Sequence, residues 1–262
     1  MNGETKMRPK EGWRKTRRVI RLLALVFGII LIVIVAYGTL LAFPEPLFAH
    51  VYSYKNFRVY TREPLDDRAR VQLDIVAQRL ATSEINDPAI THRVFVAGTS
   101  NWYTFFNGPY RRAMGRMYEF HNSLFVPQLD LASGKIVHFD GRRAPMAWIL
   151  AHEMTHTLTQ KKLGIICMWR LPFWKKEGYA EYVAHGRTVP LIEDLRMLDS
   201  LTSNVIPMGD GYDVPRQYFE AELLWRYLIE VRKLGFQEVM SDSIELNAVE
   251  TEMHCWEKAQ RN

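Results

Sequence analysis

Residues 146–158 read MAWILAHEMTHTL and contain an H-E-x-x-H pattern at His152–His156. In an α-helix, residues four apart share one face, so the two imidazoles can point at a single ion. Glu153, next to the first histidine, can reach a water at that ion and accept its proton. Because the preceding residues are apolar, we expect a buried helix over 145–161 that carries a metal-dependent hydrolytic site.

A second stretch, WKKEGYAEY at 174–182, supplies the carboxylates that such a site needs. A catalytic zinc site uses three protein ligands and leaves one position open. Glu177 can be the third ligand. Glu181, one helical turn further on, can accept the remaining ring N–H of a ligand histidine and fix its tautomer. The spacing also permits the reverse assignment, with Glu181 as the ligand and Glu177 at the rim.

HEMTH followed by WKKEGYAEY resembles the gluzincin zinc metallopeptidases, specifically the peptidase MA-like group. The resemblance implies that His152, His156 and Glu177 bind Zn²⁺ and that Glu153 is the general base. Glu181 matches an acidic position that supports the ligands in related enzymes. The sharp motifs cover residues 146–182 only. The G-x-M-E-N motif and the third histidine of metzincins are absent.

A partner for the oxyanion of the transition state is also expected, usually a tyrosine or a histidine. Tyr218 is favoured by the resemblance, which extends loosely through residues 218–235, and Tyr212 and His185 are alternatives. Residues 124–126 could be an edge strand that pairs with an extended peptide, or a core strand. Arg111, Arg112 and Arg116 could favour acidic groups of a substrate, or form a solvated loop.

Each of these residues also has an ordinary structural explanation. The two histidines and Glu153 could form a polar helix face with simple hydrogen bonds, and Glu177 could be a surface charge beside Lys175 and Lys176. The presence of all four residues at compatible spacing favours the metal site.

An uncharged run of 22 residues over 22–43 predicts a transmembrane helix. At 1.5 Å per residue it would span about 33 Å, enough for a hydrocarbon core of about 30 Å. The run is too long for the apolar part of a cleaved signal peptide. Eight Lys/Arg precede it within residues 1–21, so the N-terminus is expected in the cytoplasm and the domain outside it. In a bacterium this would be the inner membrane, with the domain facing the periplasm or the exterior.

The net charge of +5 comes from this basic flank, and the remaining residues are close to neutral, so nucleic acid is not an expected partner. Cys167 and Cys255 could form a disulfide or remain as thiols. No pattern indicates an oligomeric state.

The sequence predicts an α+β protein with strands first and helices after. We expect a cytoplasmic flank over 1–21, a transmembrane helix over 22–43, a linker over 44–56 and a zincin-like domain over 57–262. That domain would contain a small mixed sheet, an active-site helix and a helical C-terminal part. The expected function is hydrolysis of peptide bonds in a peptide or protein substrate, with the bilayer bound through residues 22–43. A catalytically silent zinc-binding or scaffold domain of an envelope complex, and a zinc amidase acting on cell-wall peptides, are the alternatives.

Overall fold

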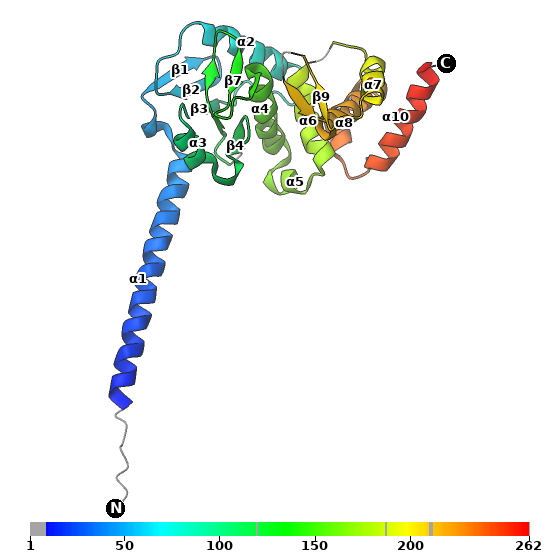
Figure 1. The fold of residues 1–262 in the computed structure, drawn as a ribbon. Helices are drawn as coiled ribbons and strands as arrows, with labels where there is room; N and C mark the ends of the chain where they lie inside the picture. Colours follow the sequence, from blue (N-terminus) through cyan, green and yellow to red (C-terminus); the bar gives the residue numbers. More distant parts are fainter. Residues whose placement is uncertain (1–8, 119, 187, 210–211, 262) are drawn as a thin grey trace, which may run out of the picture. The chain divides into compact units, whose positions relative to one another are not determined.

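The computed structural model describes residues 9–118, 120–186, 188–209 and 212–261 (Figure 1). The chain forms two compact units, Met1–Leu47 and Phe48–Asn262. In the first unit, helix α1 (Pro9–Ala42) is followed by a short 3-10 helix, η1 (Glu45–Leu47). Residues Thr16–Ala42 of α1 are long and apolar enough to cross a membrane, as the uncharged run predicts. The helix ends before Phe43, the residue preceding Pro44, where proline disfavours helical geometry.

The second unit begins with a mixed five-stranded sheet in the order β1-β2-β3-β5-β4. Strands β2, β3 and β5 are parallel to one another, and β1 and β4 pair antiparallel at the two edges. Helix α2 (Arg68–Ala81) connects β2 to β3 and buries its apolar stripe in the core. The bounds of the strands are β1 His50–Tyr54, β2 Phe57–Thr61, β3 His92–Val96, β4 Arg116–Tyr118 and β5 Ser123–Val126.

The expected linker over 44–56 is too long. The second unit starts at Phe48, and β1 pairs with β2 along its whole length. Strand β1 lies at the sheet edge, and only its Tyr52 and Tyr54 pack partly against the core. This weak apolar alternation explains why the segment looks like a linker in the sequence.

The remainder of the unit is mainly helical, which confirms the α+β class. Four helices begin directly after a proline: Pro145, Pro172, Pro190 and Pro215. Proline has no backbone N–H, and at the start of a helix this group would have no partner within the helix, so no helical hydrogen bond is lost. The sequence also predicts helices over 215–234 and 236–258, but the structure interrupts the first with the π-helical turn η3 and the second at residues 241–245. A turn signal at Ala132–Gly134 predicts two short strands within 122–138, where the structure has three. The bounds are α3 Ser100–Asn107, η2 Gly108–Tyr110, β6 Leu129–Asp130, β7 Lys135–Val137, β8 Arg143–Pro145, α4 Met146–Leu163, α5 Ile165–Arg170, α6 Phe173–His185, α7 Leu191–Ser200, β9 Val205–Pro207, β10 Asp213–Pro215, α8 Arg216–Arg226, η3 Tyr227–Val231, α9 Phe236–Met240 and α10 Leu246–Arg261.

Gly178 determines how closely α6 packs on α8. A Cβ atom at this position would lie 2.4 Å from the carbonyl oxygen of Ala221 and 2.6 Å from the ring of Trp225. The indole N–H of Trp225 donates to the carbonyl oxygens of Trp174 and Lys175, at 3.2 and 3.0 Å. The glycine of the E-G-x-A segment is therefore required by the close approach of α6 to α8.

Candidate metal centre

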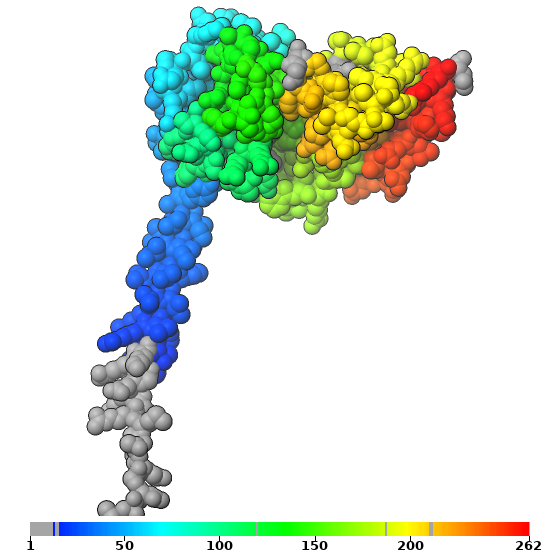
Figure 2. Space-filling view, viewed as in Figure 1, coloured from blue at the N-terminus to red at the C-terminus, as the bar shows by residue number. Residues whose placement is uncertain are grey.

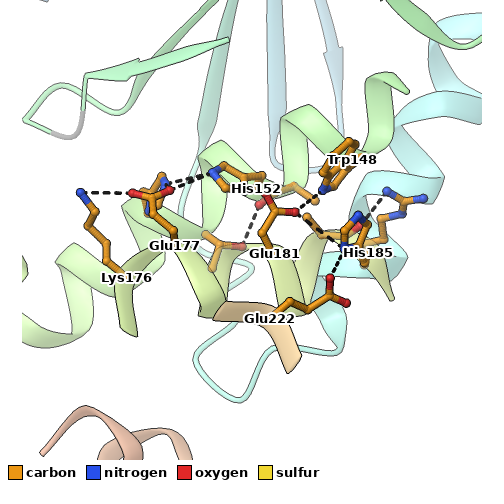
Figure 3. Close-up of polar contacts among 12 residues, drawn as sticks. Trp148, His152, Lys176, Glu177, Glu181, His185 and Glu222 are labelled. Atoms are coloured by element: carbon orange, nitrogen blue, oxygen red, sulfur yellow. Dashed lines mark hydrogen bonds and ion pairs between the residues drawn. The ribbon is translucent and has the colours of Figure 1, made fainter. Parts of the chain in front are cut away.

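Three side chains from α4 and α6 converge on one point (Figure 3). The Nε2 atoms of His152 and His156 lie 3.2 Å apart, and each lies 3.3 Å from Oε2 of Glu177. In a tetrahedral site with bonds of about 2.0–2.1 Å, neighbouring ligand atoms are roughly 3.3 Å apart. The three atoms thus have the spacing of three corners of such a site, and this cluster could hold a metal ion. The spacing within each motif indicates which side chains share a helical face, and the structure brings Glu177 together with the two histidines.

Glu181 lies behind His152, on the side away from Glu177. Its Oε1 is 3.2 Å from Nδ1 of His152, and its Oε2 accepts a hydrogen bond of 2.7 Å from the indole of Trp148. With Nδ1–H directed at this carboxylate, His152 would present Nε2, the atom that faces His156 and Glu177, to a metal ion. Glu177 is therefore the carboxylate within the cluster and Glu181 the one that orients a histidine.

His185 and Glu222 extend this network further from the cluster (Figure 3). Nδ1 of His185 contacts Oε2 of Glu222 from α8 and lies 3.8 Å from Oε2 of Glu181. The imidazole stacks on Trp148 at 4.6 Å. The structure thus places His185 behind Glu181 and not beside a reacting group, so it is not positioned for the oxyanion. Its i+4 spacing from Glu181 could have indicated this position, whereas no pattern in the sequence singles out Glu222.

The buried carboxylates and imidazoles perturb one another's ionisation. Burial opposes ionisation of Glu177, but the nearby His156 and His152 outweigh it and hold the pKa of the carboxyl far below its usual range. For Glu181, burial is likewise outweighed by His152, and its pKa is lowered. Burial would lower the pKa of His152, but Glu181 and Glu177 raise it well above 6.5. The carboxylates of Glu177 and Glu181 thus stay ionised beside the histidines, and such negative charge favours a bound cation.

The two histidines of the cluster differ in their outer contacts. Nδ1 of His152 meets Glu181, whereas Nδ1 of His156 is buried without a hydrogen-bond partner among the described residues. On the far side, Nζ of Lys176 lies 3.2 Å from Oε1 of Glu177, the oxygen that does not face the histidines. Lys176 therefore orients the carboxylate and leaves Oε2 in the cluster.

Glu153 is held by the edge of the sheet. The backbone N–H of Met117 in β4 donates a hydrogen bond of 3.0 Å to its Oε2. This approach needs Gly115, since a Cβ there would lie 2.9 Å from Ile149 and 3.3 Å from Cγ of Glu153. The carboxylate stays outside the ligand triangle with Oε1 available, as a proton acceptor requires. No signal in the sequence links Met117 to the H-E-x-x-H helix.

A cavity of about 240 Å³ opens at this point and is lined by both His152 and Glu153. Tyr212 and Tyr218 line it as well, and the ring of Tyr218 is centred 6.3 Å from that of His152. Burial, followed by the effect of Glu177, raises the pKa of Tyr218 to about 12. Burial, followed by the effect of Glu181, raises the pKa of Tyr212 above that of Tyr218. Both phenols keep their proton at neutral pH and can donate hydrogen bonds into the cavity.

No protein-family model, curated protein or solved structure matches this chain.

Of the other residues that the sequence analysis considered, some line the cavity and the others have structural positions away from it. Residues 124–126 belong to β5, which is buried between β3 and β4, so they form a core strand and the edge strand is β4. Of the three arginines singled out, Arg112 lines the cavity, while Arg116 packs over the ring of Tyr110 at 4.1 Å. Cys167 and Cys255 are both free and exposed.

Proposed function

We propose that this chain is a membrane-anchored, zinc-dependent metallopeptidase of the gluzincin type. The triangle formed by Nε2 of His152, Nε2 of His156 and Oε2 of Glu177 carries the proposal, because its sides of 3.2–3.3 Å suit a tetrahedral ion. Two imidazoles and a carboxylate are a donor set that zinc uses in catalytic sites. When bound there, zinc would act as a Lewis acid on a carbonyl group and would lower the pKa of water.

The chain's own residues supply the remaining chemistry. Glu153 faces the cavity beside the first histidine and accepts the proton of the attacking water through its free oxygen. It then delivers this proton to the nitrogen that leaves as the amide bond breaks. The bond from Met117 keeps the carboxylate pointed at the cavity between the two transfers.

The phenol of Tyr218 donates a hydrogen bond to the oxygen that becomes negative as water attacks. It stays protonated because its pKa is about 12, and it lies on the same wall of the cavity as His152. An uncharged donor that is already in position stabilises developing charge without reorganisation. Tyr212 is the alternative donor, since it lines the same cavity.

The charge asymmetry around the apolar span supports a compartment for the site. Eight Lys/Arg precede the apolar span, and we infer from this asymmetry that residues 1–21 remain in the cytoplasm. The Phe48–Asn262 unit would then act outside the cytoplasm, on peptides or proteins close to the membrane.

The test uses the full chain in detergent or nanodiscs, with metal content and cleavage of a peptide library measured in parallel. We expect the parent to contain about one zinc per chain and to cleave peptides. Glu153→Gln should retain zinc and lose turnover by about 10²–10⁴-fold, since it removes the general base. His152→Ala should lose zinc, and Glu220→Gln, an exposed change on α8, is the matched control.

Equal cleavage rates for Glu153→Gln and the parent would refute the mechanism. A parent that holds zinc but cleaves no peptide would point to the scaffold alternative. Cleavage confined to cell-wall fragments, assayed beside the library, would assign the amidase instead.

A further inference from the structure

Three large apolar side chains of the Phe48–Asn262 unit gather on the surface around helix α5. Ile166 and Trp169 are 65% and 68% exposed, and Phe120 is 63% exposed. The rings of Phe120 and Trp169 meet edge to face at 5.7 Å. Met168, which lies between Ile166 and Trp169 on α5, is buried. One side of α5 therefore packs on the core, and the other side presents its apolar side chains at the surface. An exposed aromatic cluster of this kind marks a contact surface.

The stretch of sequence that carries this cluster is rich in positive charge. Residues 154–176 contain five Lys/Arg and no Asp or Glu. Lys161, Lys162 and Arg170 are exposed, and none of them forms an ion pair with a residue that the structure describes. Lys175 and Lys176 are engaged elsewhere, with the carbonyl of Ser241 and with Glu177. The free cations therefore lie at the end of α4 and on α5, beside the apolar side chains.

The domain cannot move far from a bilayer that holds α1. The apolar helix ends at Ala42 and the folded unit starts at Phe48, so residues 43–47 are the only connection. Five residues reach at most about 18 Å. Within the unit, Phe48 stacks on Phe106 of α3, at 5.9 Å, and Figure 1 shows α3 and α5 along the same lower edge of the domain. The α5 cluster thus lies on the side of the domain where its chain begins.

We propose that Phe120, Ile166 and Trp169, with Lys161, Lys162 and Arg170, form an interfacial patch that docks the domain on an anionic bilayer. Aromatic side chains favour the headgroup level, and lysine and arginine are attracted to anionic lipids there. A membrane surface is the occupant that matches both the apolar centre and the unpaired positive rim, and the anchor supplies it at short range. The patch carries this inference independently of the zinc chemistry.

Cys167 and Cys255 provide the experiment, because both are exposed thiols and only the first lies on α5. The full chain is reconstituted in nanodiscs with 30% phosphatidylglycerol in phosphatidylcholine, or with phosphatidylcholine alone. One spin label is attached to Cys167 in the Cys255→Ser chain, or to Cys255 in the Cys167→Ser chain. Power saturation then measures the accessibility of the label to oxygen, which enters lipid, and to a water-soluble nickel complex.

We expect the label at Cys167 to be several-fold less accessible to nickel and more accessible to oxygen than the label at Cys255, on anionic discs. The difference should shrink on phosphatidylcholine alone and in the chain carrying Lys161→Gln, Lys162→Gln and Arg170→Gln. The control chain removes the same charge at exposed Arg196, Lys233 and Lys258 and should keep the difference.

Three results would overturn the proposal. Equal nickel access at the two labels would place the patch in water. Low access to both reagents at Cys167 would indicate burial against protein, such as a second copy of the chain. Equal effects of the patch variant and its control would remove the basic rim from the contact.

Discussion

The sheet and the helices of the Phe48–Asn262 unit bury polar groups in opposite ways. The sheet has an aromatic and aliphatic interior in which Phe95, stacked on Tyr60 and Phe125, is fully buried. Its buried histidine, His92, has no hydrogen-bond partner on either ring nitrogen among the described residues. Burial alone lowers the pKa of His92 to about 4, so the ring is neutral.

The helical region instead buries charges, most of them in pairs. His152, in contrast to His92, has a pKa raised well above 6.5, because Glu181 and Glu177 outweigh its burial. On α6, α7 and α8 the buried charged residues are Lys175, Glu177, Glu181, Asp194, Glu222 and Arg226. Buried charges are costly unless each has a partner, and they concentrate at functional sites. The comparison shows that one compact unit uses a neutral core for stability and an ionic core around its candidate site.

The largest expected effect comes from breaking a buried pair in the helical region. Asp194→Ala removes the buried partner of the Arg226 guanidinium, which is 3% exposed and still pairs with the more exposed Glu230. We expect the free energy of unfolding, measured in urea, to fall towards the lower end of about 3–5 kcal/mol, because Glu230 compensates part of the buried charge. The matched control, Glu220→Ala, breaks the exposed pair with Arg216 and should lower stability much less. Equal losses would mean that the helical core does not depend on its ionic pairs.

Because His92 in the sheet is buried in its neutral form, we expect the free energy of unfolding to decrease in acid. Unfolded chains take up a proton on this residue near pH 6.5, whereas folded chains do so only near pH 4. Between these values the unfolded state binds more protons, so stability falls as the pH falls, by about 3 kcal/mol in total.

Replacing His92 with Phe tests this origin. The ring would stack on Phe57 as the imidazole does, at 5.7 Å, and the loss between pH 6.5 and 4 should shrink. His50→Phe on the exposed edge strand is the control for the change itself. An unchanged pH dependence of unfolding in His92→Phe would assign the acid sensitivity to the paired carboxylates.

Glu181 sharpens the comparison at the site. Glu181→Gln weakens the acceptor for Nδ1 of His152, and we expect a 10–100-fold loss in zinc affinity. Glu222→Gln should cost less, because Glu222 contacts His185 and not a member of the triangle. Competition with a chromophoric chelator measures the zinc affinity of both variants. A larger loss of affinity in Glu222→Gln than in Glu181→Gln would contradict the proposal that Glu181 is the carboxylate that supports the triangle.

The smallest effect concerns packing between the two helices that carry the ionic core. Gly178→Ala gains helix propensity but forces a methyl group against the carbonyl of Ala221, so we expect a net loss of about 1–2 kcal/mol in stability. Gly115→Ala meets side chains of Ile149 and Glu153, which can move, and should lose less stability. Urea unfolding distinguishes the two, and a stabilised Gly178→Ala would contradict the close approach.

Much of this architecture could be predicted from local patterns. The uncharged run over 22–43 and the H-E-x-x-H helix each depend on neighbours along the chain, and the structure has a helix at each. Strand β1 could not be identified in this way, because an edge strand buries little and its pairing with β2 decides its state. The break at residues 241–245, which interrupts an expected helix, could not be identified from local patterns either.

The sequence by itself determined which residues share a helical face: His152 with His156, and Glu177 with Glu181, each four residues apart. Only the tertiary structure decided that Glu177 enters the triangle while Glu181 turns to Nδ1 of His152, because this depends on how α6 crosses α4. It also decided that the amide of Met117 holds Glu153 and that Glu222 meets His185. The physical reason is that helical periodicity is a local property, whereas contacts between elements depend on packing, here set by Gly115 and Gly178.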